Sequence, residues 1–398
     1  MSRSNKRVPA LAEEGLASGV RSQFQSLFNG QPLLVRSPGR VNLIGEHTDY
    51  NEGFVLPAAV DKAIYFAVGP GQGSRCVLHA HDLGEGHSFE LGRLAKSEKR
   101  WPNYLLGVVD QLQKAGARLA GFNCVFGGNI PIGSGMSSSA AIEAGLAFCL
   151  NKMFSLGLDE LTLVKLAQKA ENEFVGVRCG IMDQFINIFG KPNSVLKLDC
   201  RSLAYRYYPF EKKDLRIVLC DTLVKRELAS SEYNVRRQQC ESGVNLLAKY
   251  RPGLRSLRDV PLELLENHRP EFDPVVYKRC DYVLRENLRV EQACGDLERG
   301  DFSSFGKRMF RSHEGLRNDY GVSCRELDVL VEAARATKGV LGSRMMGAGF
   351  GGCTINLIEE RAVDFLKENA VQSYRAEFRK EPKLYISRLE SGTEVLES

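Results

Sequence analysis

The sequence predicts a globular protein of two domains that contains both strands and helices. A chain of 398 residues is too long for one ordinary hydrophobic core, so two domains are expected. Hydrophobic residues make up 43% of the chain and charged residues 26%, which is typical of folded soluble proteins. Apolar runs of strand type prevail in the first half, and longer helical patterns prevail in the second.

Composition and charge exclude several classes of protein. The net charge is only +5, with acidic and basic residues interspersed, which argues against a dedicated nucleic-acid surface. No apolar run follows the basic N-terminal residues or approaches the roughly 20 residues of a membrane span, so neither a signal peptide nor a membrane helix is expected. The 11 cysteines are scattered without a Cys-x-x-Cys pair, which indicates buried thiols. The expectation is a soluble, cytoplasmic protein that acts as a monomer without nucleic acid or membrane.

The first half begins with about 20 polar and weakly amphipathic residues, which are predicted to form a flexible segment with a frayed helix. The predicted strands of this half cover residues 33–36, 64–68, 76–80, 122–126 and 195–199. Trp101 and Pro102 open a predicted helix, because proline is tolerated in a first turn and apolar residues recur through Leu112. His79, His81 and His87 lack cysteine or carboxylate partners at ligand spacing, so they are interpreted as solvated side chains rather than a metal site.

The segment Pro131–Ala140, Pro-Ile-Gly-Ser-Gly-Met-Ser-Ser-Ser-Ala, has the composition of a phosphate-binding loop and runs into a helical pattern. Its two glycines allow positive φ angles and a close approach of the backbone to a ligand, and its three consecutive serines supply hydroxyl donors. The start of the helix adds unpaired N–H groups and partial positive charge, which favour an anion. No lysine follows the glycines, which excludes a P-loop. A loop that merely caps a core helix is the alternative.

A second candidate site follows the apolar residues that end at Ile44. Within a few positions the chain changes to Glu46, His47 and Asp49, whose side chains can all bond to hydroxyl groups. This is the chemistry of a polyol-binding site. A charged turn on the surface is the alternative, because turns favour the same residue types.

A third candidate is Asp183, which lies in the apolar sequence Ile-Met-Asp-Gln-Phe over residues 181–185. A carboxylate is rarely buried unless it is paired, so Asp183 either faces a functional cleft or meets a cation. A helix cap is the alternative reading. Glu171 precedes it by twelve residues, near the end of a helix predicted over 161–174.

The second half is predicted to contain a strand over 215–221 and several long helices. The helices are expected over 227–250, 272–300, 301–319 and 324–336, and residues 251–270, with prolines and mixed charge, are expected to form a flexible surface excursion. The run Gly347–Gly352 has Gly-x-Gly-x-x-Gly spacing, but it follows a helix and opens a strand over 353–358. That order excludes the dinucleotide-binding fingerprint, which follows a strand and opens a helix.

Three separated segments together resemble the GHMP small-molecule kinases, the family of galactose, homoserine, mevalonate and phosphomevalonate kinases, and within it the galactokinase branch. They are Pro38–Asn51 (Pro-Gly-Arg-Val-Asn-Leu-Ile-Gly-Glu-His-Thr-Asp-Tyr-Asn), the loop Gly133–Ala140, and Gly347–Thr354. Residues 179–184 and 228–233 also match family segments. The resemblance runs from about residue 24 to beyond residue 387.

The resemblance implies ATP-dependent phosphorylation of the anomeric hydroxyl of α-D-galactose to galactose 1-phosphate, a step of galactose catabolism. It implies that Asp183 is the catalytic base and that Arg40 polarises it and stabilises the transition state. The implied sugar contacts are Glu46, His47, Thr48, Asp49, Gly180 and Tyr233. The implied phosphate contacts are Gly133, Ser134, Gly135, Met136, Ser137, Ser138 and Ser139, and the implied magnesium ligands are Ser139 and Glu171.

The resemblance also implies an α+β fold of two lobes, with a mixed sheet and helices in each lobe and the active site between them. The expected units are a flexible segment 1–20, an N-terminal domain 21–204 with the sugar signature and the phosphate loop, and a C-terminal domain 205–398 with a Gly-rich loop at 342–354. Two other functions stay open: a related kinase for N-acetylgalactosamine, arabinose or galacturonate, and a galactose sensor without catalysis. The intact serine run disfavours the sensor, because the sensors of this family are damaged there.

Overall fold

The first lobe is built on a six-stranded mixed sheet. The computed structural model describes residues 8–396 apart from 211 and 225–228. The strands of this sheet are β1 (Leu33–Asn42), β3 (Pro57–Pro70), β4 (Arg75–Ala80), β5 (Glu85–Glu90), β6 (Phe122–Gly128) and β13 (Glu394–Val395). They are ordered β13-β1-β3-β6-β4-β5, and only β4 and β6 run parallel among them. The strands predicted over 33–36, 64–68, 76–80 and 122–126 are confirmed.

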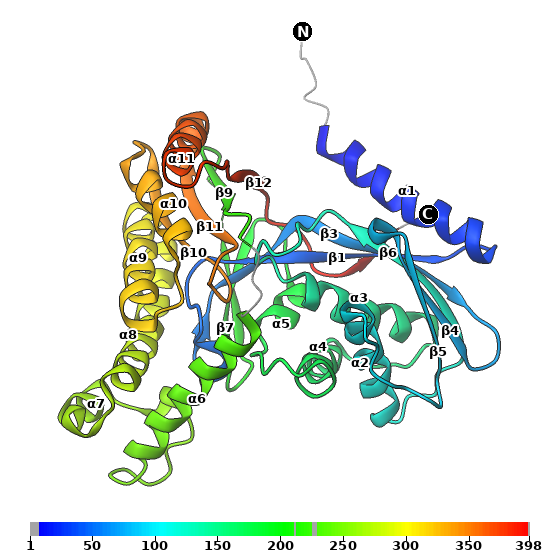
Figure 1. Cartoon of the computed structure of the whole chain (residues 1–398), viewed down its shortest axis with the longest axis horizontal. Helices are drawn as coiled ribbons and strands as arrows, with labels where there is room; N and C mark the ends of the chain where they lie inside the picture. The colour runs from blue at the N-terminus through cyan, green and yellow to red at the C-terminus, as the bar shows by residue number, and fades with distance from the viewer. Residues whose placement is uncertain (1–7, 211, 225–228, 397–398) are drawn as a thin grey trace.

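Helices cover both faces of this sheet (Figure 1). They are α1 (Val8–Phe28), α2 (Arg100–Lys114), α3 (Ser138–Met153), α4 (Glu160–Lys169) and α5 (Met182–Phe189). Helix α1 lies on one face against β3 and β6, and α3 and α5 pack on the other against β1 and β3. The expected boundary at residue 20 falls inside α1. Val20 and Phe24 are buried against the sheet, so burial on one side orders a helix whose composition is largely polar.

The second lobe contains a four-stranded antiparallel sheet covered by helices. Its strands are β9 (Leu215–Asp221), β10 (Val340–Met345), β11 (Cys353–Glu359) and β12 (Lys383–Ser387), in the order β10-β11-β9-β12. Its helices are α6 (Ala229–Leu247), α7 (Leu262–Asn267), α8 (Pro274–Glu298), α9 (Phe302–Gly315), α10 (Arg325–Ala336) and α11 (Val363–Phe378). The first residues of the helix expected over 227–250 lie outside the described part of the chain. The Gly347–Gly352 run follows the strand β10 and not, as predicted, a helix. It opens the paired strand β11 instead of a helix, so the exclusion of a dinucleotide-binding turn still holds.

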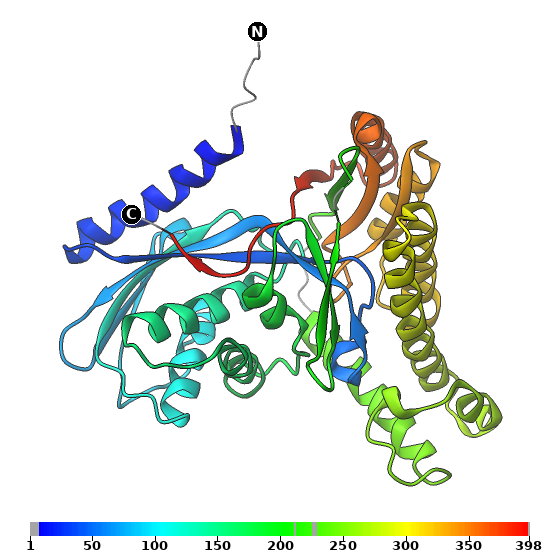
Figure 2. The same cartoon turned by 180° about the vertical axis from the view of Figure 1, so that it is seen from behind.

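Two segments differ from the sequence-based expectation. Residues 251–270 form no loose excursion, because Leu257 and Leu265 are buried in a hydrophobic cluster of the second lobe. The C-terminal end does not stay in the second lobe: β13 pairs with β1, and Figure 2 shows the last segment running back along the first sheet. The expected unit 205–398 therefore includes an end that belongs structurally to the first lobe.

A small third sheet completes the fold, and no disulfide contributes to it. The strands β2 (Phe54–Val55), β7 (Ser194–Asp199) and β8 (Tyr205–Pro209) form a separate three-stranded sheet. None of the 11 cysteines forms a disulfide; Cys179, Cys200 and Cys324 are half-buried and the others are buried. Among the helices of the described residues, none is long and apolar enough to cross a membrane.

Candidate active site

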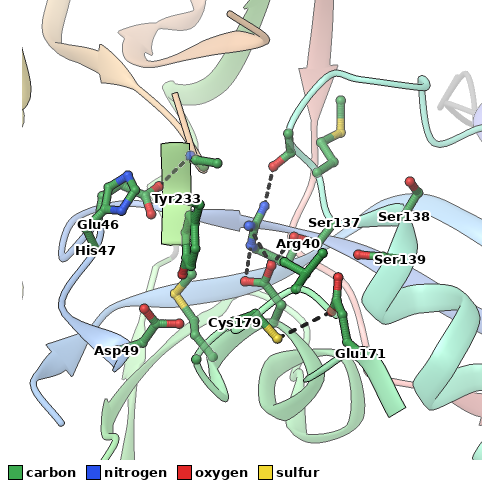
Figure 3. Close-up of a pocket in the computed structure, with 18 of the residues that line it drawn as sticks. Arg40, Glu46, His47, Asp49, Ser137, Ser138, Ser139, Glu171, Cys179 and Tyr233 are labelled. Carbon is green, nitrogen blue, oxygen red and sulfur yellow. Dashed lines mark hydrogen bonds and ion pairs between the residues drawn. The ribbon is translucent and has the colours of Figure 1, made fainter. Parts of the chain in front are cut away.

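A cavity of about 330 Å³ lies where the two lobes meet, and it gathers most of the predicted site residues. The predicted residues that line it are Arg40, Glu46, His47, Asp49, Gly133, Gly135, Met136, Ser137, Ser138, Ser139, Glu171, Gly180, Asp183 and Tyr233. Figure 3 shows Glu46, His47, Asp49 and Tyr233 on one side of Arg40, and Ser138, Ser139 and Glu171 on the other. Segments that are far apart in the sequence therefore converge on one cleft.

Two predicted binding residues lie outside the lining of this cavity. The Thr48 side chain is fully buried, and its hydroxyl is placed to donate to the carbonyl oxygens of Gly45 at 2.9 Å and Phe54 at 2.6 Å. Ser134 is also fully buried, and its carbonyl oxygen accepts from the Cys353 N–H at 3.1 Å. Both residues hold the backbone of a site loop in place and do not present side chains to the cavity.

The phosphate-loop candidate has the backbone conformation that its sequence predicts. Gly133 and Gly135 have φ angles of 79° and 84°, and Ser137, directly before α3, has a φ of 54°. The left-handed conformation at Ser137 is unusual for a residue with a side chain, and such positions cluster at functional sites. The Arg40 N–H donates to the Met136 carbonyl at 3.1 Å, so the loop is fixed to β1 as well as to β11.

Asp183 lies in the first turn of α5, and its cation partner is Arg40 of β1. The guanidinium donates from Nε to Oδ1 and from Nη2 to Oδ2, each at 2.8 Å, and the Ser137 hydroxyl also donates to Oδ2. Burial opposes the charge on Arg40, but the neighbouring carboxylates, led by Asp183, raise its pKa overall. The bidentate pair fixes a carboxylate, whose side chain is still 27% exposed, between the loop and the polar cluster.

Glu171 lies in a π-helical turn, Ala170–Val175, that continues α4, whereas the sequence predicted one regular helix. Burial, followed by the charge of Asp183, raises the pKa of Glu171, and the Ser139 hydroxyl opposes that shift. The Gln184 amide bridges Glu171 at 2.8 Å and the fully buried Glu143 at 3.2 Å. Sequence inspection missed Glu143, one turn after Ser139, although a glutamate in an otherwise apolar helix was a usable signal.

Glu46 is held by the second lobe. The Arg344 guanidinium of β10, which is fully buried, donates from Nη2 to Glu46 Oε1 at 3.0 Å, and the Gly347 N–H donates to the same oxygen at 2.7 Å. Arg344 also donates to the carbonyls of Asn42 and Leu43 at the end of β1. This role of Arg344 was not predicted, because the strand that carries it was not recognised in the sequence.

His47 and Asp49 have opposite pKa shifts with the same main cause. Burial lowers the pKa of His47 to about 3, with a smaller contribution from Arg236, so the ring is neutral. Burial raises the pKa of Asp49 to about 7, with a smaller contribution from Asp183. Gly180 leaves room for the Asp49 carboxylate, since a Cβ there would lie 2.0 Å from Asp49 Oδ2.

No group of three or more His, Cys, Asp or Glu side chains in the described residues is arranged to hold a metal ion by itself. Glu171 nevertheless offers a buried carboxyl group beside the Ser139 hydroxyl, and Asp183 adds negative charge nearby. Oxygen ligands of this kind suit Mg²⁺, which keeps waters and takes its other ligands from phosphate oxygens.

Comparisons with known proteins agree with this geometry. Family models match residues 22–70 ("Galactokinase galactose-binding signature"), 103–191 ("GHMP kinases N terminal domain") and 293–376 ("GHMP kinases C terminal"). The chain is 42% identical to the galactokinase of Roseiflexus sp. (strain RS-1) over 377 residues, which cover 94% of this chain and 95% of that protein. The chain belongs to the galactokinase family. It is therefore an enzyme of the kinase class with the GHMP fold.

Solved structures support the same assignment. The crystal structure of Lactococcus lactis galactokinase complexed with galactose superposes with a TM-score of 0.91 at 34% identity, covering 95% of this chain and 99% of that one. The Methanococcus jannaschii mevalonate kinase superposes with a TM-score of 0.60 at 18% identity, covering 91% of this chain and 99% of that one, a likeness of fold alone. The α+β fold of two lobes, with the cavity between them, is confirmed.

Proposed function

We propose that the protein transfers the γ-phosphoryl group of ATP to the anomeric hydroxyl of α-D-galactose and forms galactose 1-phosphate. The observation that carries the proposal is the position of Asp183. Its carboxylate is fixed by Arg40 between a loop suited to phosphates and a cluster suited to hydroxyl groups. A sugar hydroxyl in that cluster would meet a general base and a phosphoryl group at the same point.

In this proposal Asp183 accepts the proton of the attacking hydroxyl. Arg40 keeps the carboxylate ionised and adds positive charge near the transferring phosphoryl group, which carries negative charge in the transition state. Phosphoryl transfer depends mainly on positioning and charge neutralisation, so the rigid contacts around Arg40 are as important as its charge.

The sugar is held by side chains that exchange hydrogen bonds with hydroxyl groups. Glu46 and Asp49 accept, and His47 and Tyr233 have groups that donate. Gly180 contributes space and backbone beside Asp49. Thr48, which resemblance placed among these contacts, supports the turn that presents them.

The nucleotide phosphates lie on the Gly133–Ser139 loop, where backbone N–H groups and the start of α3 favour an anion. Ser139 and Glu171 would hold Mg²⁺ through a hydroxyl and a carboxylate oxygen. When bound, the metal ion supplies charge neutralisation on the phosphates. Ser134 contributes through its backbone contact with β11, which fixes the loop.

Two alternatives are separated by one experiment. Radiolabelled ATP is incubated with the protein and a panel of galactose, N-acetylgalactosamine, arabinose and galacturonate, and product is measured for each sugar. Fastest turnover with galactose supports the proposal, and a preference for another sugar replaces it with the related kinase. Galactose binding without any turnover would make the protein a sensor. We also propose that the enzyme is monomeric and cytoplasmic, which light scattering and cell fractionation test.

A further inference from the structure

His47 can recognise a sugar in two ways, depending on which ring nitrogen carries its proton. The ring is buried and neutral at ordinary pH, so one nitrogen donates a hydrogen bond and the other accepts one. Figure 3 places the ring beside Glu46 and Tyr233 at the sugar end of the site. Whatever fixes the proton on one nitrogen therefore decides what His47 offers to the substrate.

A chain of hydrogen bonds from the second lobe ends on this ring. Nδ1 of His47 lies 2.8 Å from the Tyr50 hydroxyl, which lies 2.6 Å from the Tyr320 hydroxyl. The Tyr320 hydroxyl in turn lies 3.3 Å from Sγ of Cys240. His47 and Tyr50 follow β1 in the first lobe, whereas Tyr320 ends the π-helical turn Leu316–Tyr320 after α9. The Tyr320 ring also packs on the imidazole, with 4.9 Å between their centroids.

Two observations indicate which group donates in each of these hydrogen bonds. The Ala348 backbone raises the pKa of His47, which is the effect of a carbonyl facing a ring N–H. Tyr50 already engages Nδ1, so that N–H is on Nε2, which is buried at the cavity wall beside Ala348 and makes no well-aligned hydrogen bond among the described residues. The cavity is also rich in acceptors, because Glu46 and Asp183 present carboxylates. A sugar hydroxyl that donates to a carboxylate still needs a donor for its own oxygen.

We propose that Tyr320 is a positioning residue for sugar recognition: its hydroxyl donates to Tyr50, Tyr50 donates to Nδ1 of His47, and Nε2–H of His47 is thereby held as a donor to one hydroxyl oxygen of the sugar. The inference rests on the proposed sugar kinase function. Without the Tyr320 hydroxyl, the Tyr50 hydroxyl can accept from Nδ1–H instead of donating to Nδ1. The ring can then carry its proton on Nδ1, and Nε2 no longer donates to the sugar.

The variant Tyr320→Phe removes one hydroxyl and keeps the ring that packs on His47. The KM for galactose should rise about three- to tenfold, the net worth of one hydrogen bond, while the KM for ATP changes less than about twofold. Tyr207→Phe is the matched control. It removes a hydroxyl that donates to the Phe189 carbonyl at 2.6 Å, outside the cavity lining, and should leave the KM for galactose unchanged.

Monodeoxygalactoses separate a defined contact from a general loss of fit. Wild type should bind one deoxy analogue more weakly than galactose, because that analogue lacks the hydroxyl that His47 contacts. Tyr320→Phe should bind that analogue and galactose about equally, because the variant has already lost the contact. If wild type and variant are equally sensitive to every analogue, or if the KM for galactose is unchanged, the proposal is overturned. Should Tyr320→Phe fold poorly, Tyr50→Phe interrupts the same chain one step nearer to His47 and is judged by the same criteria.

Nitrogen-15 NMR of histidine-labelled protein reads the tautomer directly. The chain has 6 histidines, and the His47 signal is identified by its loss in His47→Gln. The wild-type ring should be protonated on Nε2, with part of the proton moving to Nδ1 in Tyr320→Phe. A wild-type ring protonated on Nδ1 overturns the proposal. This measurement needs no substrate, so the tautomer of His47 is determined whether or not the protein phosphorylates sugars. Absence of sugar phosphorylation would overturn the proposed function alone.

Discussion

Replacing Arg344 by Met should weaken both the fold and galactose binding, because it removes the only guanidinium that reaches Glu46 among the described residues. Glu46 is 2% exposed and would keep only the Gly347 N–H on Oε1. Removing one partner of a buried ion pair typically costs about 3–5 kcal/mol of stability. Two carbonyls at the end of β1 would also lose their donor, at about 1 kcal/mol each.

The variant Arg344→Lys keeps the charge but has one nitrogen in place of a planar fork, so it should fall between wild type and Arg344→Met. Urea unfolding measures stability, and calorimetry measures galactose and ATP binding separately. Galactose affinity should fall while ATP affinity changes little, since Arg344 acts through Glu46. The double variant Arg344→Met/Glu46→Gln removes both charges. Its loss in free energy of unfolding should be at least about 1 kcal/mol smaller than the sum of the losses of the two single variants. Additive losses, or wild-type galactose affinity in Arg344→Lys, would refute this reasoning.

Further predictions concern individual contacts in the cavity. Because the pKa of Asp49 is raised to about 7 in the folded protein, the contribution of the Asp49 carboxyl group to the stability of the ligand-free protein should be lost as pH rises from about 4 through about 7. Asp49→Asn should flatten that loss on pH-dependent thermal melts and still bind galactose less well; an unchanged pH profile contradicts the shift. Glu46→Ala or Asp49→Ala should each weaken galactose binding by about 1–3 kcal/mol with little effect on ATP, and equal losses for both ligands would mean a structural role. Gly180→Ala should raise the KM for galactose, because the added Cβ collides with the Asp49 carboxylate, and an unchanged KM would show that the carboxylate can move. Ser139→Ala should shift the magnesium dependence of turnover, and identical magnesium titrations would leave Ser139 as a helix cap.

The local parts of the site could be predicted from the sequence because each has a local physical cause. Gly133 and Gly135 permit the positive φ angles of the loop, and the unpaired N–H groups of α3 follow from where the helix begins. The change from Ile44 to Glu46 marks the point where the chain leaves the buried sheet for the cavity. Such features depend on a few neighbouring residues, so a motif is enough to locate them.

The contacts between lobes could not be predicted, because they depend on residues hundreds of positions apart. Arg344 meets Glu46 across 298 positions of sequence because the pairing of β10 with β11 places it there. The short, partly polar sequence of β10 carries no strand signal. Tyr320 meets Tyr50 in the same way, through a π-helical turn that the sequence does not mark. The length and order of helix α1, which was expected only as a frayed helix, and the strand β13 were missed for a related reason. Contacts with the first sheet, and not their own patterns, order both segments.

The most direct test of the central claim is a single preparation of Asp183→Asn, measured for turnover, for calorimetric binding of galactose and ATP, and for thermal stability. Asparagine keeps the size of the side chain and can still accept from Arg40, but it cannot take a proton at neutral pH. The account predicts a fall in kcat of at least about 10²-fold with both ligands still bound and the fold intact. Turnover near the wild-type value with intact binding would contradict the assignment of Asp183 as the catalytic base.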